Sequence, residues 1–120
     1  MTAARLNRVV LAILAVVLVV SGVVGLVSPG HQSTSEAPAY DVFHLVAGAI
    51  GMILVLSNQA TRIRRFNIVF GLIDLYQAVA SVLHLFPAAL FRWTTTDDAV
   101  HVAIGMGLVA AGLAGGRARR

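Results

Sequence analysis

Four apolar segments, separated by short polar stretches, constrain the fold of this chain more than any other feature of its sequence. A helix of about 20 apolar residues is long enough to cross the hydrocarbon core of a bilayer. Only 12% of the residues are charged, whereas a soluble domain usually has about 25%. The pattern predicts an all-α membrane protein, a bundle of four transmembrane helices in a single domain over residues 1–120. We expect these helices at about 9–27, 41–56, 67–86 and 98–114.

The first apolar run, Val9–Val27, could instead be a secretory signal peptide. The apolar core of a signal peptide is about 7–15 residues long and is followed directly by a small-x-small cleavage site. This run is longer, and the one such site, Ala37-Pro38-Ala39, lies well downstream. We therefore expect the run to be retained as the first transmembrane helix.

The second and fourth segments resemble each other at one constant offset, which suggests an internal repeat. The segments that precede the first and third helices also match, Arg5-Leu6-Asn7 with Arg65-Phe66-Asn67. These matches predict two pseudo-repeated helical hairpins, related by an axis along the membrane normal. The equivalent pairs in the second and fourth segments are Asp41 with Asp98, His44 with His101, and Gly48 with Gly105.

The positive charges predict the orientation of the helices in a membrane. The chain has no lysine, and eight of its nine arginines fall on one side of the predicted bundle. Arg92 alone falls on the other side. The positive-inside rule then predicts a multi-pass protein of the bacterial inner membrane with both termini in the cytoplasm. The same distribution explains the basic net charge without a nucleic-acid partner.

Small residues at helical spacing predict close helix packing in lipid. The glycines that we expect at helix contacts are Gly48, Gly51, Gly105 and Gly107. Such surfaces could pack the bundle itself, a homo-oligomer or a partner in a larger membrane complex, and the sequence does not divide these uses.

The third segment carries an unusual polar stripe. Asp74, Gln77, Ser81 and His84 fall within an arc of about 80° on a helix. Asp74 is expected near the middle of the bilayer, where buried ionisable groups often mark a proton or ion path. The alternative is a neutral Asp74 that forms a hydrogen bond with a neighbouring helix, with Gln77 beside it.

Histidines at one level of the bundle suggest a metal site at the outer face. Imidazole and carboxylate groups could bind zinc or copper, and two facing helical histidines could bind haem. The same residues could instead be interfacial groups and helix caps, because aspartate is a preferred N-cap and complements the helix dipole. His31, in the first loop, is not an expected ligand. The candidate ligands are His44, His84 and His101, with Asp41 and Asp98 beside them.

The sequence carries no motif of soluble enzyme chemistry. It has no phosphate-binding loop, no Gly-x-Ser-x-Gly elbow and no His-Glu-x-x-His pair. The absence of cysteine excludes disulfides and iron–sulfur clusters. We therefore predict that the chain is not an enzyme and has no required cofactor.

Three separated blocks between Tyr40 and Leu113 resemble a family of small bacterial integral membrane proteins of unknown function. The family pattern is Asn-x-x-His-Leu-x-x-Gly-x-x-Gly in one helix and Ala-Asp-Asn-x-x-His-x-x-x-Gly in the last. The chain departs from it at Asp41 and Asp98, where the family tends to have asparagine. Because asparagine caps helices but is a poor metal ligand, this departure favours capping over metal binding. The matching positions are His44, Gly48, Gly51, Asp97, His101 and Gly105.

Three functions remain open at this point. The leading hypothesis is a structural or accessory subunit that packs in the inner membrane. The second is metal or haem binding at the outer face. The third is proton-coupled permeation through Asp74.

Overall fold

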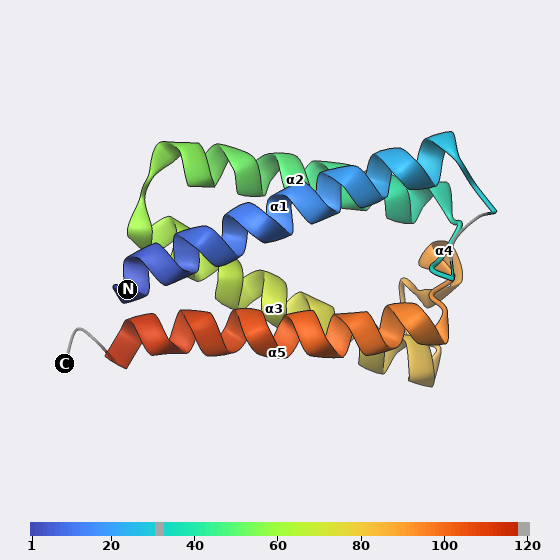
Figure 1. Cartoon of the computed structure of the whole chain (residues 1–120). Helices are drawn as coiled ribbons and strands as arrows, with labels where there is room; N and C mark the ends of the chain where they lie inside the picture. The colour runs from blue at the N-terminus through green and yellow to red at the C-terminus, as the bar shows by residue number, and fades with distance from the viewer. Residues whose placement is uncertain (31–32, 118–120) are drawn as a thin grey trace.

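The computed structural model describes residues 1–30 and 33–117, with the side chain of Arg117 left out. His31, Arg119 and Arg120 therefore lie outside the described residues. The described chain is helical throughout, with short connections, and the all-α prediction is confirmed (Figure 1). Four of the helices are long and apolar enough to cross a membrane. The helices are α1 (Ala3–Val27), α2 (Pro38–Ser57), α3 (Ala60–Leu83), α4 (Ala88–Phe91) and α5 (Thr95–Arg117).

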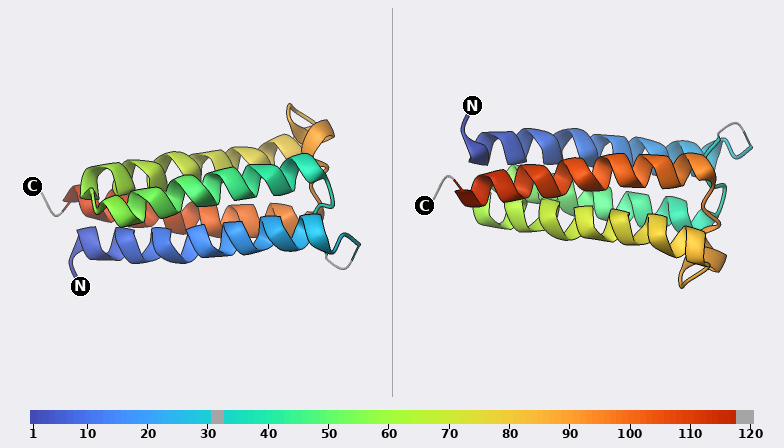
Figure 2. Two further views of the ribbon diagram at one scale, coloured as in Figure 1. Left: turned by 90° about the horizontal axis from the view of Figure 1, so that it is seen from above. Right: turned by 90° about the horizontal axis from the view of Figure 1, so that it is seen from below.

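The long helices form two hairpins, α1–α2 and α3–α5, and the most extensive packing lies within each hairpin. The bundle is elongated, with a long axis of 45 Å. The start of α1, the end of α5 and the α2–α3 connection lie at one end, which we call the termini end (Figure 2). The α1–α2 and α3–α5 connections, with α4, lie at the other end, which we call the loop end.

Glycines allow the two helices of the first hairpin to approach each other closely. A Cβ atom at Gly48 would lie 3.0 Å from the carbonyl oxygen of Ala15 in α1. One at Gly51 would lie 3.2 Å from the side chains of Ala15 and Leu11. The expected packing role of both glycines therefore agrees with their positions.

The second hairpin has a closer backbone contact. A Cβ at Gly71 would lie 2.9 Å from the carbonyl oxygen of Gly105, and a Cβ at Gly105 would lie 2.8 Å from that of Gly71. Gly112 faces Ile68 in the same interface. Gly107 does not contribute, because a Cβ there would meet nothing within 4 Å. The prediction that Gly107 packs a helix of this chain is therefore wrong, since Gly107 lies on an exposed face of α5.

A pair of asparagines joins the two hairpins near the termini end. Asn7 and Asn67 are 1% and 0% exposed. Asn67 Nδ2 donates to Oδ1 of Asn7 at 2.9 Å and to its carbonyl oxygen at 3.1 Å. Asn7 Nδ2 in turn donates to the carbonyl oxygen of Ala111 at 2.9 Å. The two residues matched by the predicted repeat are thus bonded to each other across the bundle.

The helices begin earlier than the apolar pattern predicts. α1 starts at Ala3, where the Thr2 hydroxyl accepts a hydrogen bond from Arg5 N, and α3 starts at Ala60. The apolar run marks the lipid-facing span, whereas arginine and asparagine continue the helix beyond it because both are tolerated there. α3 also ends earlier than predicted, at Leu83, where His84 takes a left-handed conformation with φ of 57°.

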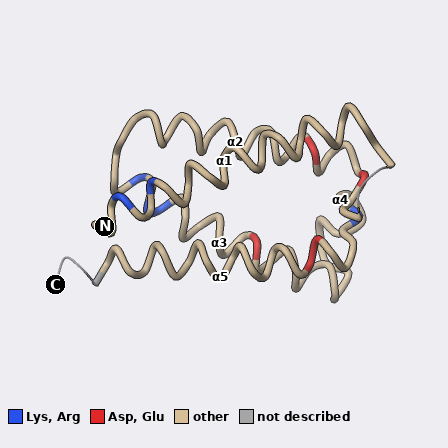
Figure 3. Tube along the Cα trace, viewed as in Figure 1, with Lys and Arg blue, Asp and Glu red and all other residues tan. Residues whose placement is uncertain are grey.

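The charges separate along the bundle. Arg5, Arg8 and the arginines of α3 lie at the termini end, and the acidic residues lie in the other half (Figure 3). Arg8 Nε donates to the carbonyl of Val55, and Arg64 Nε donates to that of Gly112. Among the described arginines, Arg92 alone lies at the loop end.

Candidate functional site

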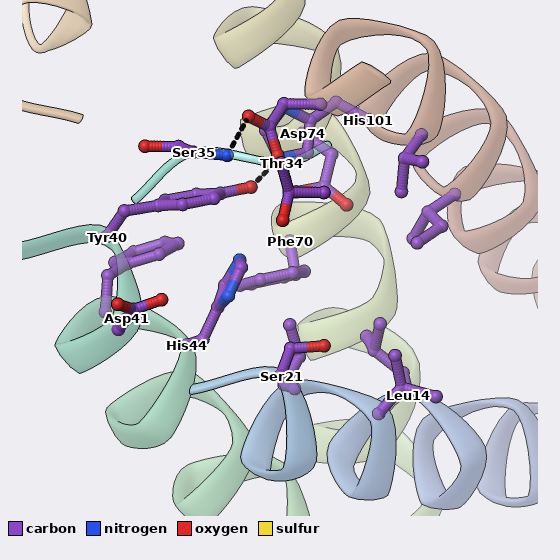
Figure 4. Close-up of a pocket in the computed structure, with 16 residues that line it drawn as sticks. Leu14, Ser21, Thr34, Ser35, Tyr40, Asp41, His44, Phe70, Asp74 and His101 are labelled. Atoms are coloured by element: carbon purple, nitrogen blue, oxygen red, sulfur yellow. Dashed lines mark hydrogen bonds between the residues drawn. The ribbon is translucent and has the colours of Figure 1, made fainter. Parts of the chain in front are cut away.

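A cavity of about 120 Å³ lies between the two hairpins at the loop end. All four long helices and the 28–37 connection contribute to its wall (Figure 4). Its polar wall contains two imidazoles, a phenol, hydroxyls and three carboxylates, a combination that is uncommon inside an apolar bundle. The polar side chains of the wall include Ser21, Ser35, Tyr40, Asp41, His44, Asp74, Asp97 and His101.

A short hydrogen bond crosses one wall of the cavity. The hydroxyl oxygen of Tyr40 in α2 lies 2.6 Å from Nε2 of His101 in α5. Both side chains are buried, at 3% and 4% exposure. The Tyr40 ring also packs against the ring of His44, with centroids 4.0 Å apart. His101 Nδ1 and His44 Nδ1 have no hydrogen-bond partner within the described chain.

Asp97 ties the α1–α2 connection to the start of α5. Its Oδ2 accepts hydrogen bonds from Ser35 N at 2.7 Å and from Thr94 N at 2.8 Å. Asp97 N donates to the Thr94 hydroxyl at 3.3 Å, so the two residues form a reciprocal capping box. The Ser35 hydroxyl donates to the carbonyl of Phe91. Asp97 is therefore held by structural partners, although it lines the cavity.

Asp74 extends the polar wall of the cavity toward the middle of α3. It is 3% exposed, and its Oδ1 accepts a hydrogen bond from Gln77 Nε2 at 3.1 Å. The stripe predicted on α3 is divided, because Ser81 and His84 line a different cleft. Asp74 and Gln77 thus form a local pair in the bundle interior, and Asp74 also lines the cavity.

Asp41 and Asp98 occupy different environments despite their equivalent places in the repeat. α2 begins at Pro38 after Ala37, so Asp41 lies in the first turn and is not the N-cap. Its carboxylate packs against Gly25 of α1, where a Cβ would overlap it. Asp98 likewise lies in the first turn of α5, does not line the cavity and is not the cap, a role that Thr94 takes. The predictions that Asp41 and Asp98 cap their helices are therefore wrong.

The predicted three-histidine site does not form in the described part of the chain. His44 and His101 line the cavity, whereas His84 lies in a separate cleft beside Arg92. Among residues 1–30 and 33–117, no group of three or more His, Asp or Glu side chains is arranged to hold a metal ion. The early end of α3 is the physical reason, because His84 leaves the helix in a left-handed conformation.

Haem does not fit the cavity. An apolar cavity of about 150 Å³ holds one benzene molecule, and a haem is several times larger than benzene. The cavity of about 120 Å³ therefore admits only a small molecule, an ion or several waters.

A close-packed layer separates the cavity from the termini end. Leu11, Ile63 and Leu108 are at most 2% exposed and lie on the termini side of the cavity-lining residues of their helices. Asn7 and Asn67 close the bundle beyond them. The polar wall thus reaches inward from the loop end only.

The sequence did not point to Tyr40 or Ser35 as site residues. Tyr40 directly precedes the first Asp-x-x-His segment and lies four residues before His44. This spacing places both rings on one face of a helix, which is the signal that could have identified Tyr40. Ser35 belongs to a connection without a motif. Comparisons of this chain with protein-family models, curated proteins and solved structures find no match.

Proposed function

We propose that this chain is a multi-pass protein of the bacterial inner membrane whose cavity binds a small cation from the outer side. The separation of arginines and acidic residues along the bundle supports this orientation, with both termini in the cytoplasm. A periplasmic reporter fused after residue 120 is expected to be inactive, and a cytoplasmic reporter active.

The chemistry of the cavity wall supports the proposal that the cavity binds a cation. Asp41 and Asp74 are buried, at 4% and 3% exposure, and neither arginine nor lysine is among the residues that line the cavity. An isolated carboxylate in a membrane interior is costly unless it is protonated or paired with a cation. A cation that enters the cavity would pair with these carboxylates in their ionised form, whereas without a cation they are stable when protonated.

The aromatic residues of the cavity wall indicate which kind of cation the cavity would bind. Tyr40, Phe43 and Phe70 line the same cavity, and aromatic faces attract alkylammonium groups. A metal ion with a complete protein ligand set is disfavoured, because the described His and Asp side chains do not converge as ligands. We propose a small amine in its ammonium form as the ligand.

We propose binding and not catalysis. Asp97 is held by three structural donors, counting the Thr94 hydroxyl at 3.0 Å, and His101 Nε2 is bonded to Tyr40. These groups hold the wall in place, and the third group that would orient a catalytic base is missing, because His101 Nδ1 has no hydrogen-bond partner within the described chain. The chain is thus proposed to act as a receptor-like or accessory membrane protein.

The single tryptophan supplies a direct test. The Trp93 ring centroid lies 5.9 Å from that of His101, so occupation of the cavity should change its fluorescence. We expect methylammonium to give a saturable change in purified protein and sodium at the same ionic strength to give none. Asp74→Asn should weaken the methylammonium response about tenfold, because a charge-assisted contact contributes roughly 1.5–3 kcal/mol.

Asp98→Asn is the matched control, since Asp98 is a half-buried acid of α5 that does not line the cavity. It should leave the methylammonium response unchanged. An equal response to sodium and methylammonium, or equal affinities in wild type and Asp74→Asn, would refute the proposal.

The resemblance to the small bacterial family is consistent with this proposal. Of the matching residues, His44, Asp97 and His101 line the cavity, and Gly48, Gly51 and Gly105 pack the hairpins that form it. We propose that the chain belongs to that family and that the cavity is a feature of the family pattern.

An accessory subunit is the second candidate, favoured by one observation. Gly107 lies in an open apolar groove between α1 and α5, lined also by Val10, Ile13 and Ile104. Glycine on a lipid-facing surface permits close approach of another transmembrane helix. Gly107→Leu should then abolish co-purification of a membrane partner or a second copy without unfolding the bundle; retention of the partner would exclude this use of the groove.

A further inference from the structure

A second cleft at the loop end has a composition unlike that of the cavity. Its volume is about 220 Å³, and it lies between the end of α3, α4 and the segment that follows α4. It shares no lining residue with the cavity between the hairpins. Its lining residues are Ser81, His84, Ala88, Ala89, Arg92 and Trp93.

The polar groups of the cleft can all donate hydrogen bonds, and no acidic residue lines it. Arg92 supplies a permanent positive charge, and Ser81 and His84 supply a hydroxyl and an imidazole. Trp93 Nε1 is a buried donor that lacks an acceptor within the described chain. Such a set of donors around one arginine matches an oxyanion.

The cleft also lies where phosphate groups are found if the four long helices cross a bilayer. It is at the end of the spanning helix α3. Large apolar side chains beside it are exposed, with Phe86 at 81%, Leu90 at 53% and Leu85 at 43%. Apolar groups that face the acyl chains next to an arginine and a tryptophan are typical of the lipid headgroup level.

The position of Arg92 supports the same conclusion. It directly follows α4, and among the described arginines it is the one at the loop end. The α3–α4 segment that precedes it is anchored, because the Tyr76 hydroxyl donates to the Phe86 carbonyl at 2.7 Å. Arg92 is therefore presented at a defined level.

We infer that this cleft binds the phosphate group of an anionic phospholipid in the leaflet at the loop end. Arg92 and the indole N–H of Trp93 are its main donors. The phosphate is held by charge-assisted hydrogen bonds, and the exposed Leu85, Phe86 and Leu90 contact the acyl chains. Free phosphate presents the same oxygens but lacks the acyl chains, so the two sources are separable by experiment.

The test is native mass spectrometry of the full chain in detergent, with phosphatidylglycerol or diacylglycerol of identical acyl chains added. We expect saturable adducts with phosphatidylglycerol and none with diacylglycerol. Arg92→Gln should weaken the phosphatidylglycerol adduct about tenfold, in proportion to the loss of one charge-assisted contact. Arg62→Gln is the matched control, because Arg62 is an exposed arginine of α3 at the opposite end of the bundle.

Trp93→Phe is a second variant that removes the indole donor and keeps an aromatic ring. It should weaken the adduct about fivefold, as expected for one neutral hydrogen bond, and circular dichroism should confirm that both variants are folded. Equal adducts in wild type and Arg92→Gln, or equal binding of diacylglycerol, would overturn the inference. Displacement of the lipid by an equal concentration of inorganic phosphate would also overturn it, because the site would then select the free ion.

Discussion

The hydroxyl oxygen of Tyr40 lies 2.6 Å from Nε2 of His101, which joins α2 of the first hairpin to α5 of the second. At the opposite end, Asn67 joins α3 to α1 through Asn7. The hairpins are thus connected by buried polar contacts near both ends, with the cavity next to the first contact and an apolar layer in between.

Tyr40→Phe should destabilise the bundle by about 1–3 kcal/mol, because it leaves His101 Nε2 buried without a partner. Thermal unfolding in detergent measures the change. Tyr76→Phe is the matched control, since its hydroxyl contacts the Phe86 carbonyl at an exposed position. If the two variants have the same unfolding temperature, the buried Tyr40 hydroxyl stabilises the bundle no more than the exposed Tyr76 hydroxyl does.

The asparagine pair gives a test of how the hairpins are joined. Asn67→Leu and Asn7→Leu should each destabilise the bundle, and the double variant should lose less than the sum of the two. The coupling energy should be about 0.6 kcal/mol and at most about 1.7 kcal/mol, the average and the maximum for side-chain hydrogen bonds between membrane helices. Strict additivity in a double-mutant cycle would show that the bond contributes nothing.

Gly105 and Gly107 lie two residues apart on α5, but Gly105 packs against α3 whereas Gly107 is exposed. Gly105→Leu should cost at least about 2 kcal/mol, because the side chain would meet the α3 backbone at Gly71. Gly107→Leu should leave the unfolding temperature unchanged, since nothing lies within 4 Å of its Cβ position. A larger loss of stability in Gly107→Leu than in Gly105→Leu would contradict the observed rotation of α5.

That pair also shows what the sequence could and could not predict. The number of membrane-spanning helices follows from the apolar runs, and their pairing in hairpins follows from the short connections. The rotation of each helix does not, because beyond His101 α5 is apolar on all sides and its glycines occur at several spacings. The sequence predicts a contact at Gly107, where there is none, and does not distinguish Gly112, which faces Ile68.

The candidate site was predicted only in part, for a related reason. Asp74, His44 and His101 could be located because polar residues stand out in apolar helices. Tyr40 and Ser35 could not, since their roles depend on how one connection folds over the other. The sequence predicts a helix that continues to Phe86 and so groups His84 with the other histidines, whereas α3 ends at Leu83.

The proposed cation-selective cavity reaches into the bundle from the loop end, and accessibility of a cysteine in place of Ser21 tests this proposal. The chain has no native cysteine, and Ser21 of α1 lines the cavity. Val16→Cys is the control, because Val16 lies 50% exposed on the outer surface of α1, facing lipid. The rate of thiol modification is measured with a positively charged ethylammonium methanethiosulfonate and a negatively charged ethylsulfonate analogue, added to the outside of intact cells. We expect the cationic reagent to modify Ser21→Cys at least about tenfold faster than the anionic one, given the strength of charge-assisted contacts, and Val16→Cys to stay unmodified. Equal rates for the two reagents at Ser21→Cys, or no modification there, would contradict it.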